Sequence, residues 1–172
     1  MNPFLTALAL TLAATTATAQ SVDPGQYYKL TTQFRGPGMP LDVTNGGAED
    51  NFTHLAQNGN YSGQFWHLAA QGDGTYRLTT RFRGEGMCLD VVNGGPLNNR
   101  THLAPCGNYS GQFWQLVPAG GGALRMTTMF RGPDMCLDVV NGGPANNATH
   151  LAPCANYSGQ FWSLIPTGQR VN

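Results

Sequence analysis

Short segments in which apolar and polar residues alternate, separated by glycine-rich turns, recur along most of the chain. Alternation with a period of two is typical of β-strands that bury one face. In the middle of the chain the pattern predicts four strands, at residues 76–82, 87–92, 101–105 and 112–117. The turns between them are expected at residues 83–86, 93–96 and 108–111. Short strands with turns at this spacing indicate an all-β barrel or sandwich.

The alternation also assigns side chains to faces. Leu89 and Val91 point to one face of their strand and Asp90 points to the other. In the last strand, Trp114 and Leu116 share the apolar face and are expected to form a core pair. The equivalent pairs elsewhere are Trp66 with Leu68 and Trp162 with Leu164. The three tryptophans are therefore predicted to be core residues.

This four-strand pattern occurs three times along the chain, with a period of 48 residues. Gln-Phe-Trp begins at Gln64, Gln112 and Gln160, and Leu-Asp-Val begins at Leu41, Leu89 and Leu137. Between residues 81–118 and 129–166, 30 of 38 positions are identical without a gap. An open solenoid would need atypical end repeats, but the first and last copies are full-length and similar. Closure about a threefold axis is favoured, which predicts a β-trefoil of three 48-residue repeats at about residues 26–71, 72–119 and 120–168.

The N-terminus has the pattern of an export signal. Residues 4–14 form an apolar run of 11 residues, too short to cross a bilayer, and Ala17 and Ala19 have the small-residue spacing of a cleavage site. We expect residues 1–19 to be a signal peptide and residues 20–172 to be one secreted domain, extracellular or periplasmic, with no membrane span. Because the first residues contain no Lys or Arg, an N-terminal arm is the alternative.

Charge and cysteine spacing narrow the class further. Nine basic and nine acidic residues give no net charge, which argues against a nucleic-acid partner. Cys88 and Cys106 are 18 residues apart, as are Cys136 and Cys154. Bridges within each repeat are the simplest of the three pairings, and the first repeat lacks one. A zinc site is the alternative, although no Cys-x-x-Cys spacing is present.

The threefold Gln-x-Trp, the Cys-Leu-Asp-Val strand and the paired cysteines resemble the ricin B-chain-type lectin domain, a β-trefoil. The resemblance covers about residues 26–168 and implies a glycan partner. It assigns three kinds of residue to each sugar site: an aspartate that accepts hydrogen bonds from two sugar hydroxyls, a glutamine that orients it, and a polar residue on the next strand. These residues are Asp42, Asp90 and Asp138; Gln64, Gln112 and Gln160; and His54, His102 and His150.

The chain departs from the family pattern at two positions. Alanine occupies the place of the usual stacking aromatic, at Ala56, Ala104 and Ala152. Glycine replaces a common asparagine directly before the glutamine, at Gly63, Gly111 and Gly159. Tyr61, Tyr109 and Tyr157 lie three residues before the glutamines and are the candidate replacement rings. The alternatives are that each tyrosine packs on a turn and that each aspartate only accepts N–H groups of the following Asn-Gly-Gly turn.

Catalysis and cofactors are not expected. A Ser110–His102–Asp90 triad lacks the Gly-x-Ser-x-Gly elbow, and each repeat offers only one shared acid, whereas glycoside hydrolysis uses two. The sequence gives no full calcium or other metal ligand set. We therefore expect a secreted, monomeric, non-catalytic lectin with up to three weak, equivalent sugar sites acting multivalently. The alternatives are a secreted protein-binding trefoil, such as a hydrolase inhibitor or a toxin accessory subunit, and a degenerate trefoil without a ligand.

Overall fold

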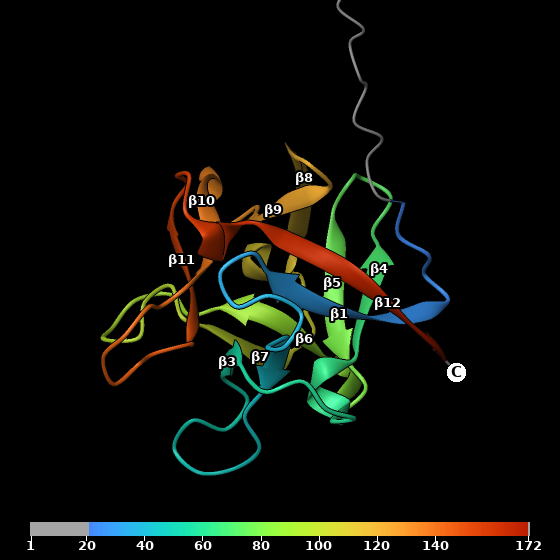
Figure 1. Cartoon of the computed structure of the whole chain (residues 1–172), viewed down its shortest axis with the longest axis horizontal. Coiled ribbons are helices and arrows are strands. Elements are labelled where there is room, and N and C mark those ends of the chain that lie inside the picture. The colour runs from blue at the N-terminus through green and yellow to red at the C-terminus, as the bar shows by residue number, and fades with distance from the viewer. Residues whose placement is uncertain (1–20, 172) are drawn as a thin grey trace, which may run out of the picture.

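The structure, a computed structural model, describes residues 21–171 (Figure 1). The expected signal peptide, residues 1–19, lies outside the described residues. The strands are β1 (Gln26–Thr32), β2 (Leu41–Val43), β3 (Thr53–Leu55), β4 (Trp66–Ala70), β5 (Tyr76–Thr80), β6 (Gly84–Val91), β7 (Thr101–Pro105), β8 (Trp114–Gly120), β9 (Ala123–Thr128), β10 (Gly132–Val139), β11 (Thr149–Pro153) and β12 (Trp162–Arg170). Three short 3₁₀ helices are η1 (Ser62–Gln64), η2 (Ser110–Gln112) and η3 (Ser158–Gln160). Within the described range no helix is long and apolar enough to span a membrane.

Six of these strands close into a ring. Their antiparallel pairing runs β1–β4–β5–β8–β9–β12 and returns from β12 to β1. Figure 1 shows β1 and β12, at the two ends of the described chain, lying side by side. Because each repeat contributes two ring strands and one hairpin, the molecule is the β-trefoil that the repeats predicted, and the fold prediction is confirmed.

The remaining strands form one hairpin in each repeat, β2–β3, β6–β7 and β10–β11. Their register places each candidate aspartate opposite the histidine of the same repeat, as in the pair Asp90 and His102. Disulfides Cys88–Cys106 and Cys136–Cys154 join the second and third hairpins to the segments that follow them, which confirms the predicted pairing.

The core contains the predicted tryptophans. Trp66, Trp114 and Trp162 are fully buried, and each indole N–H donates a hydrogen bond to a backbone carbonyl of the second strand of its repeat, at 2.8–2.9 Å. Buried leucines surround them, so the core prediction is confirmed. Leu116 is only partly buried, whereas Leu68 and Leu164 are fully buried. The expected core pair is therefore looser in the second repeat.

Three buried threonines, Thr53, Thr101 and Thr149, meet where the three repeats join. Their hydroxyl oxygens lie 2.6–2.7 Å from one another, and each hydroxyl also donates to the backbone carbonyl of another of the three residues, at 3.0–3.1 Å. Because every buried hydroxyl has a partner, this polar cluster joins the three repeats without an unsatisfied group.

Three of the four strands predicted for the second repeat have different bounds in the structure. The fourth strand of the second repeat begins at Trp114, not at residue 112, because residues 110–112 form η2 and the Gln112 side chain bonds inward. The first strand ends at Thr80, and β6 already starts at Gly84, inside the predicted turn. Gly84 has a φ of +70°, which a glycine adopts without strain, so the strand begins directly after a tight turn.

Candidate functional site

Each repeat carries an open pocket built from the same residue types. The three pockets have volumes of about 380, 370 and 510 Å³, within the range of small-molecule sites. Each is lined by the aspartate and valine that end the second strand, the next asparagine, the Asn-Tyr-Ser-Gly loop, and one phenylalanine. We name the pockets by their aspartates: the Asp42, Asp90 and Asp138 pockets.

The carboxylate of each pocket is fixed at both oxygens. In the second repeat, Asp90 Oδ1 accepts the Val91 N–H at 2.7 Å and Oδ2 accepts the Gln112 side-chain N–H at 2.9 Å. Asp42 and Asp138 make the same two bonds, at 2.7 Å to the next valine and at 2.9 and 2.8 Å to the glutamine. The resemblance to the ricin B-chain-type lectin domain implied this glutamine–aspartate pairing, and the structure places the two residues together.

The glutamines hold more than the aspartates. Gln112 is fully buried, its Oε1 accepts the Gly107 N–H at 2.8 Å, and its Nε2 also donates to the Pro105 carbonyl at 3.0 Å. Gln64 and Gln160 repeat this pattern. Each glutamine therefore connects its aspartate to the loop that carries the tyrosine. The glutamines are fully buried, and their contact with the aspartates positions the carboxylates.

The Asn-Gly-Gly turn that follows each aspartate has its own acceptor. In the first repeat the Gly46 N–H donates to Asp50 Oδ1 at 2.6 Å. Asn98 and Asn146 accept the equivalent N–H groups of Gly94 and Gly142, at 2.7 Å each. This turn-stabilising role, which was the alternative considered for the pocket aspartates, is therefore performed by residues 50, 98 and 146.

The glycine that precedes each glutamine lets the chain pass against the carboxylate. A Cβ atom added to Gly111 would overlap Asp90 Oδ1, and Gly63 and Gly159 stand in the same relation to Asp42 and Asp138. All three glycines are buried at this point of closest approach. The departure from the family's asparagine is thus a steric requirement of this arrangement.

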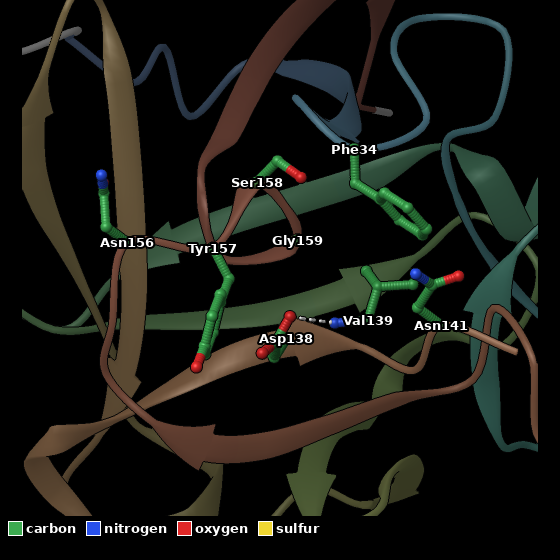
Figure 2. Close-up of a pocket in the computed structure, with 8 residues that line it drawn as sticks. All are labelled: Phe34, Asp138, Val139, Asn141, Asn156, Tyr157, Ser158 and Gly159. Carbon is green, nitrogen blue, oxygen red and sulfur yellow. Dashed lines mark hydrogen bonds between the residues drawn. The ribbon is translucent and has the colours of Figure 1, made fainter.

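Two aromatic rings border each carboxylate. The tyrosines are exposed, with exposed fractions of 61% for Tyr61 and 64% for Tyr109 and Tyr157. One face of the Tyr61 and Tyr109 rings lies against Gly59 and Gly107 of the same loop, which is the turn packing considered as the alternative. Figure 2 shows Tyr157 and Phe34 on either side of Asp138 in the third pocket. The tyrosine belongs to the same repeat as the aspartate, whereas the phenylalanine comes from the next repeat around the ring.

The phenylalanines, Phe34, Phe82 and Phe130, were missed by the sequence reasoning. Each stands in a Phe-Arg-Gly sequence that recurs with the same 48-residue period, so the repeat did mark them. Their pockets could not be assigned from one repeat, because Phe82 reaches the Asp42 pocket, Phe130 the Asp90 pocket and Phe34 the Asp138 pocket. Only closure of the ring brings the first repeat against the third.

The histidines do not line these pockets. His102 stacks on Phe52 with ring centroids 5.7 Å apart, and His54 Nδ1 lies 3.1 Å from the Thr44 hydroxyl. Burial lowers the pKa of His54, His102 and His150, and the charge of the aspartate in the same repeat partly opposes this shift. The structure therefore places the histidines as cross-strand neighbours of the aspartates, outside the Asp42, Asp90 and Asp138 pockets.

The arrangement is suited to binding polyhydroxylated rings. A fixed carboxylate accepts hydrogen bonds from hydroxyl groups, and flanking aromatic rings cover apolar C–H faces. Each of the three pockets is lined by one acidic residue, its aspartate. Glycoside hydrolysis uses a pair of carboxylates, and these pockets do not contain such a pair. Residues 21–171 contain no group of three His, Cys, Asp or Glu side chains placed to share a metal ion.

Two family models match the chain. The ricin-type beta-trefoil lectin domain matches residues 74–172, and the ricin-type beta-trefoil lectin domain-like family matches residues 18–103. A search of curated protein sequences found no significant match.

Several solved structures share the fold. The designed threefold symmetric protein ThreeFoil is 27% identical, with a TM-score of 0.68 over 81% of this chain and 97% of its own. The ricin B-like lectin of Macrolepiota procera, solved in complex with lactose, is 17% identical, with a TM-score of 0.65 over 85% of this chain and 99% of its own. The exo-beta-1,3-galactanase 1,3Gal43A of Clostridium thermocellum is 19% identical, with a TM-score of 0.65 over 87% of this chain and 31% of its own.

Proposed function

Because the chain belongs to the ricin-type beta-trefoil lectin family, a membership that supports carbohydrate binding, we propose that it is a secreted, non-catalytic lectin with one sugar site in each repeat. The pocket aspartate accepts hydrogen bonds from two neighbouring sugar hydroxyls. The tyrosine and the phenylalanine of the next repeat contact the faces of the sugar ring. The buried glutamine holds the carboxylate, and the histidine acts only as the neighbour of the aspartate across the hairpin.

The observation that carries this proposal is the threefold repetition of one complete constellation. In all three pockets a carboxylate fixed by a glutamine and a backbone N–H lines the same pocket as two aromatic rings. Both carboxylate oxygens keep acceptor capacity beyond the single bond that each accepts within the protein. Free acceptor capacity in an open pocket is what a hydroxyl-rich ligand requires.

Each site is expected to bind a sugar weakly, and the three sites together are expected to bind a polymeric glycan more tightly. An open pocket that takes one small ring offers few contacts, so single-site dissociation constants of about 1 mM are expected. Three sites on one rigid monomer gain avidity on a polymeric glycan, by about 10²-fold or more where the spacing allows simultaneous contact. A polysaccharide or a dense glycoconjugate is therefore the proposed ligand.

Secretion belongs to the same proposal. Disulfides persist mainly in oxidising compartments outside the cytosol, and this chain has two. Together with the N-terminal pattern of residues 1–19, they support an extracellular or periplasmic location.

The test is a glycan array followed by calorimetry with the best ligand. Replacing Asp42, Asp90 and Asp138 together by Asn keeps the side-chain shape but removes the charge, and should abolish binding. A matched control, Asp73→Asn, changes an exposed aspartate that lines none of the three pockets and should bind normally. Unchanged glycan binding by a folded triple variant would refute the pocket assignment. Failure of the parent protein to bind any glycan would refute the lectin proposal.

A further inference from the structure

The three pockets repeat the same constellation, but the charges beside them do not repeat. Two segments border each pocket: the loop after the aspartate strand, which begins at the lining asparagine, and the turn of the next repeat, which begins at the lining phenylalanine. The loops are residues 45–51, 93–99 and 141–147, and the matching turns are residues 82–86, 130–134 and 34–38. We call each such pair the border of its pocket.

Each border contains one arginine stacked on the pocket phenylalanine. The guanidinium carbon lies 4.1 Å from the ring centroid for Arg83 on Phe82, 4.0 Å for Arg131 on Phe130, and 4.1 Å for Arg35 on Phe34. Because the ring under each cation also lines the pocket, a positive charge stands beside every site.

The partners of these arginines differ between the pockets. At the Asp42 pocket Arg83 forms an ion pair with Asp50 at 2.7 Å. At the Asp90 pocket Arg131 donates instead to the Asn98 amide oxygen at 2.7 Å. At the Asp138 pocket Arg35 donates to Asn146 at 3.1 Å and Asn147 at 2.9 Å. An amide accepts the hydrogen bond without neutralising the charge, so Arg131 and Arg35 form no ion pair within residues 21–171.

The other acids of the borders follow the same order. Beside Asp50, the Asp42 border has Glu85. Glu49 pairs with Arg100 at 2.9 Å and lines a hollow together with Asn146, so it does not distinguish the Asp42 border from the Asp138 border. The Asp90 border has one acid, Asp134, and the Asp138 border has none. The borders therefore become more positive from the Asp42 pocket to the Asp90 pocket to the Asp138 pocket.

We propose that the Asp138 pocket selects sugars that carry an anionic substituent, a uronate carboxylate or a sulfate ester, relative to the Asp42 pocket, with the Asp90 pocket between them. This inference rests on the proposed lectin function and assigns it a ligand class. The pocket aspartate repels an anion at all three sites and so cancels in the comparison. The basic residues that hold the tyrosine loops, Lys29, Arg77 and Arg125, cancel in the same way.

The expected size of the effect follows from Coulomb's law. One unit charge about 8 to 10 Å from the ligand, in an open site with an effective dielectric of about 40 to 80, changes affinity by about two- to five-fold at low ionic strength. Salt at about 0.5 M should remove most of the difference, because the Debye length is then only about 4 to 5 Å.

The experiment measures all three sites at once in the intact protein by NMR. The backbone amides of Gly63, Gly111 and Gly159 each report on one pocket. Galactose is titrated against galacturonate, glucose against glucuronate, and galactose 6-sulfate separates a sulfate from a carboxylate preference. The ratio of anionic to neutral affinity should be at least about two- to five-fold higher at Gly159 than at Gly63, and salt should reduce the difference.

Two exchanges between the repeats test the cause. Asp50→Asn gives the first repeat the residue that the others already have, and it keeps an acceptor for Gly46 and Arg83, as Asn98 does for Gly94 and Arg131. It should raise the anionic preference at Gly63 only. Asn146→Asp should lower it at Gly159 only.

The outcomes separate the two proposals. If the ratio of anionic to neutral affinity is the same at all three pockets, the charge inference is overturned and the lectin function stands. The same holds if neither Asp50→Asn nor Asn146→Asp changes that ratio. If no sugar moves any of the three signals, the proposed function and the inference both fail.

Discussion

At the scale of single residues, the pocket aspartates depend on a neighbour that has no side chain. Gly111 lies so close to Asp90 that a methyl group would collide with the carboxylate. We predict that Gly111→Ala turns the carboxylate away and weakens sugar binding at that pocket by about tenfold or more. A hydrogen bond to a charged group contributes about 1.5 to 3 kcal/mol, which sets this scale. Titration in a variant that keeps only the Asp90 pocket measures the change.

Gly86 of the same repeat provides the control for this glycine. No atom lies within 4 Å of a Cβ built on Gly86, and its φ is not in the left-handed region. Gly86→Ala should therefore bind as the parent does. Equal binding by the two alanine variants would show that the close approach of Gly111 is irrelevant to the site.

The histidines make a second prediction at this scale. Their pKa values lie below the ordinary value of 6.5 because burial disfavours the charged ring. As pH falls through 6.5, the unfolded chain takes up protons first, so the free energy of unfolding should decrease and keep decreasing until pH reaches the lowered folded values. Urea denaturation at pH 7.5, 6.5 and 5.5 measures this slope.

Replacing the three histidines supplies the comparison. Glutamine in place of His54, His102 and His150 removes the titrating groups, so the variant should show a smaller loss of stability between pH 7.5 and 5.5. Parallel slopes for parent and variant would mean that other groups are responsible. Sugar affinity at a fixed pH should change little, since the histidines do not line the pockets.

At the scale of elements, the hairpins differ in how they are held. β6 and β7 have 8 and 5 residues and a disulfide, whereas β2 and β3 have 3 residues each and no bridge. The backbone is otherwise equivalent: Asn58 N–H donates to the Gly38 carbonyl at 2.9 Å, as Cys106 N–H does to Gly86. The first hairpin thus has the geometry of the others without their covalent link.

We predict that cysteines at Pro40 and Asn58 form a third bridge. Closing a loop of this length stabilises the folded state by about 3 kcal/mol in the chain-entropy model, less the loss of the Lys29–Asn58 hydrogen bond. Conversely, Cys88→Ser with Cys106→Ser should cost about 2 to 4 kcal/mol. Chemical denaturation measures both changes.

Hydrogen exchange shows where these changes act. In the parent, amides of β2 and β3 should exchange faster than those of β6 and β7, and the third bridge should slow them. Equal protection of the three hairpins in the parent protein would contradict this account.

Elements also show where sequence patterns were sufficient. The cysteine pairing followed from spacing, because two residues across one hairpin are close whatever the rest of the chain does. The 3₁₀ helices could not be predicted from the sequence, since Ser-Gly-Gln fits the end of a turn and the start of a strand equally well. Burial of the Gln112 amide against Asp90, a tertiary contact, decides between them.

At the scale of the whole molecule, the sequence predicted the threefold ring but not the composition of its pockets. Asp90, Gln112 and Tyr109 belong to one repeat, so they could be assigned to one candidate site from the sequence of that repeat. Phe130 belongs to the next repeat, and its contribution depends on how neighbouring repeats pack, which no single copy contains. The differences in border charge were likewise visible only after these partners were known.

The threefold arrangement makes a prediction about polymeric ligands. A variant with Asp42→Asn and Asp138→Asn keeps only the Asp90 pocket and should bind a monovalent sugar at that pocket as the parent does. Its binding to the matching polysaccharide should fall by about 10²-fold or more, because avidity is lost. Surface plasmon resonance on immobilised polysaccharide, with calorimetry for the monosaccharide, compares the two. Equal losses for both ligands would mean that the sites do not act together.

The Asp138 pocket is assembled from opposite ends of the chain, with Phe34 following β1 and Asp138 in β10. A sugar bound there would contact both sides of the junction where β1 pairs with β12. By thermodynamic linkage, whatever loosens that junction lowers affinity at this pocket, and an occupied pocket resists opening of the junction by the same factor. An isolated repeat would carry the aspartate part of one pocket on one side and the phenylalanine part of another pocket on the other side. Three copies of a single repeat would therefore complete three pockets only by assembling into a trimer, and ligand binding and assembly would then favour each other.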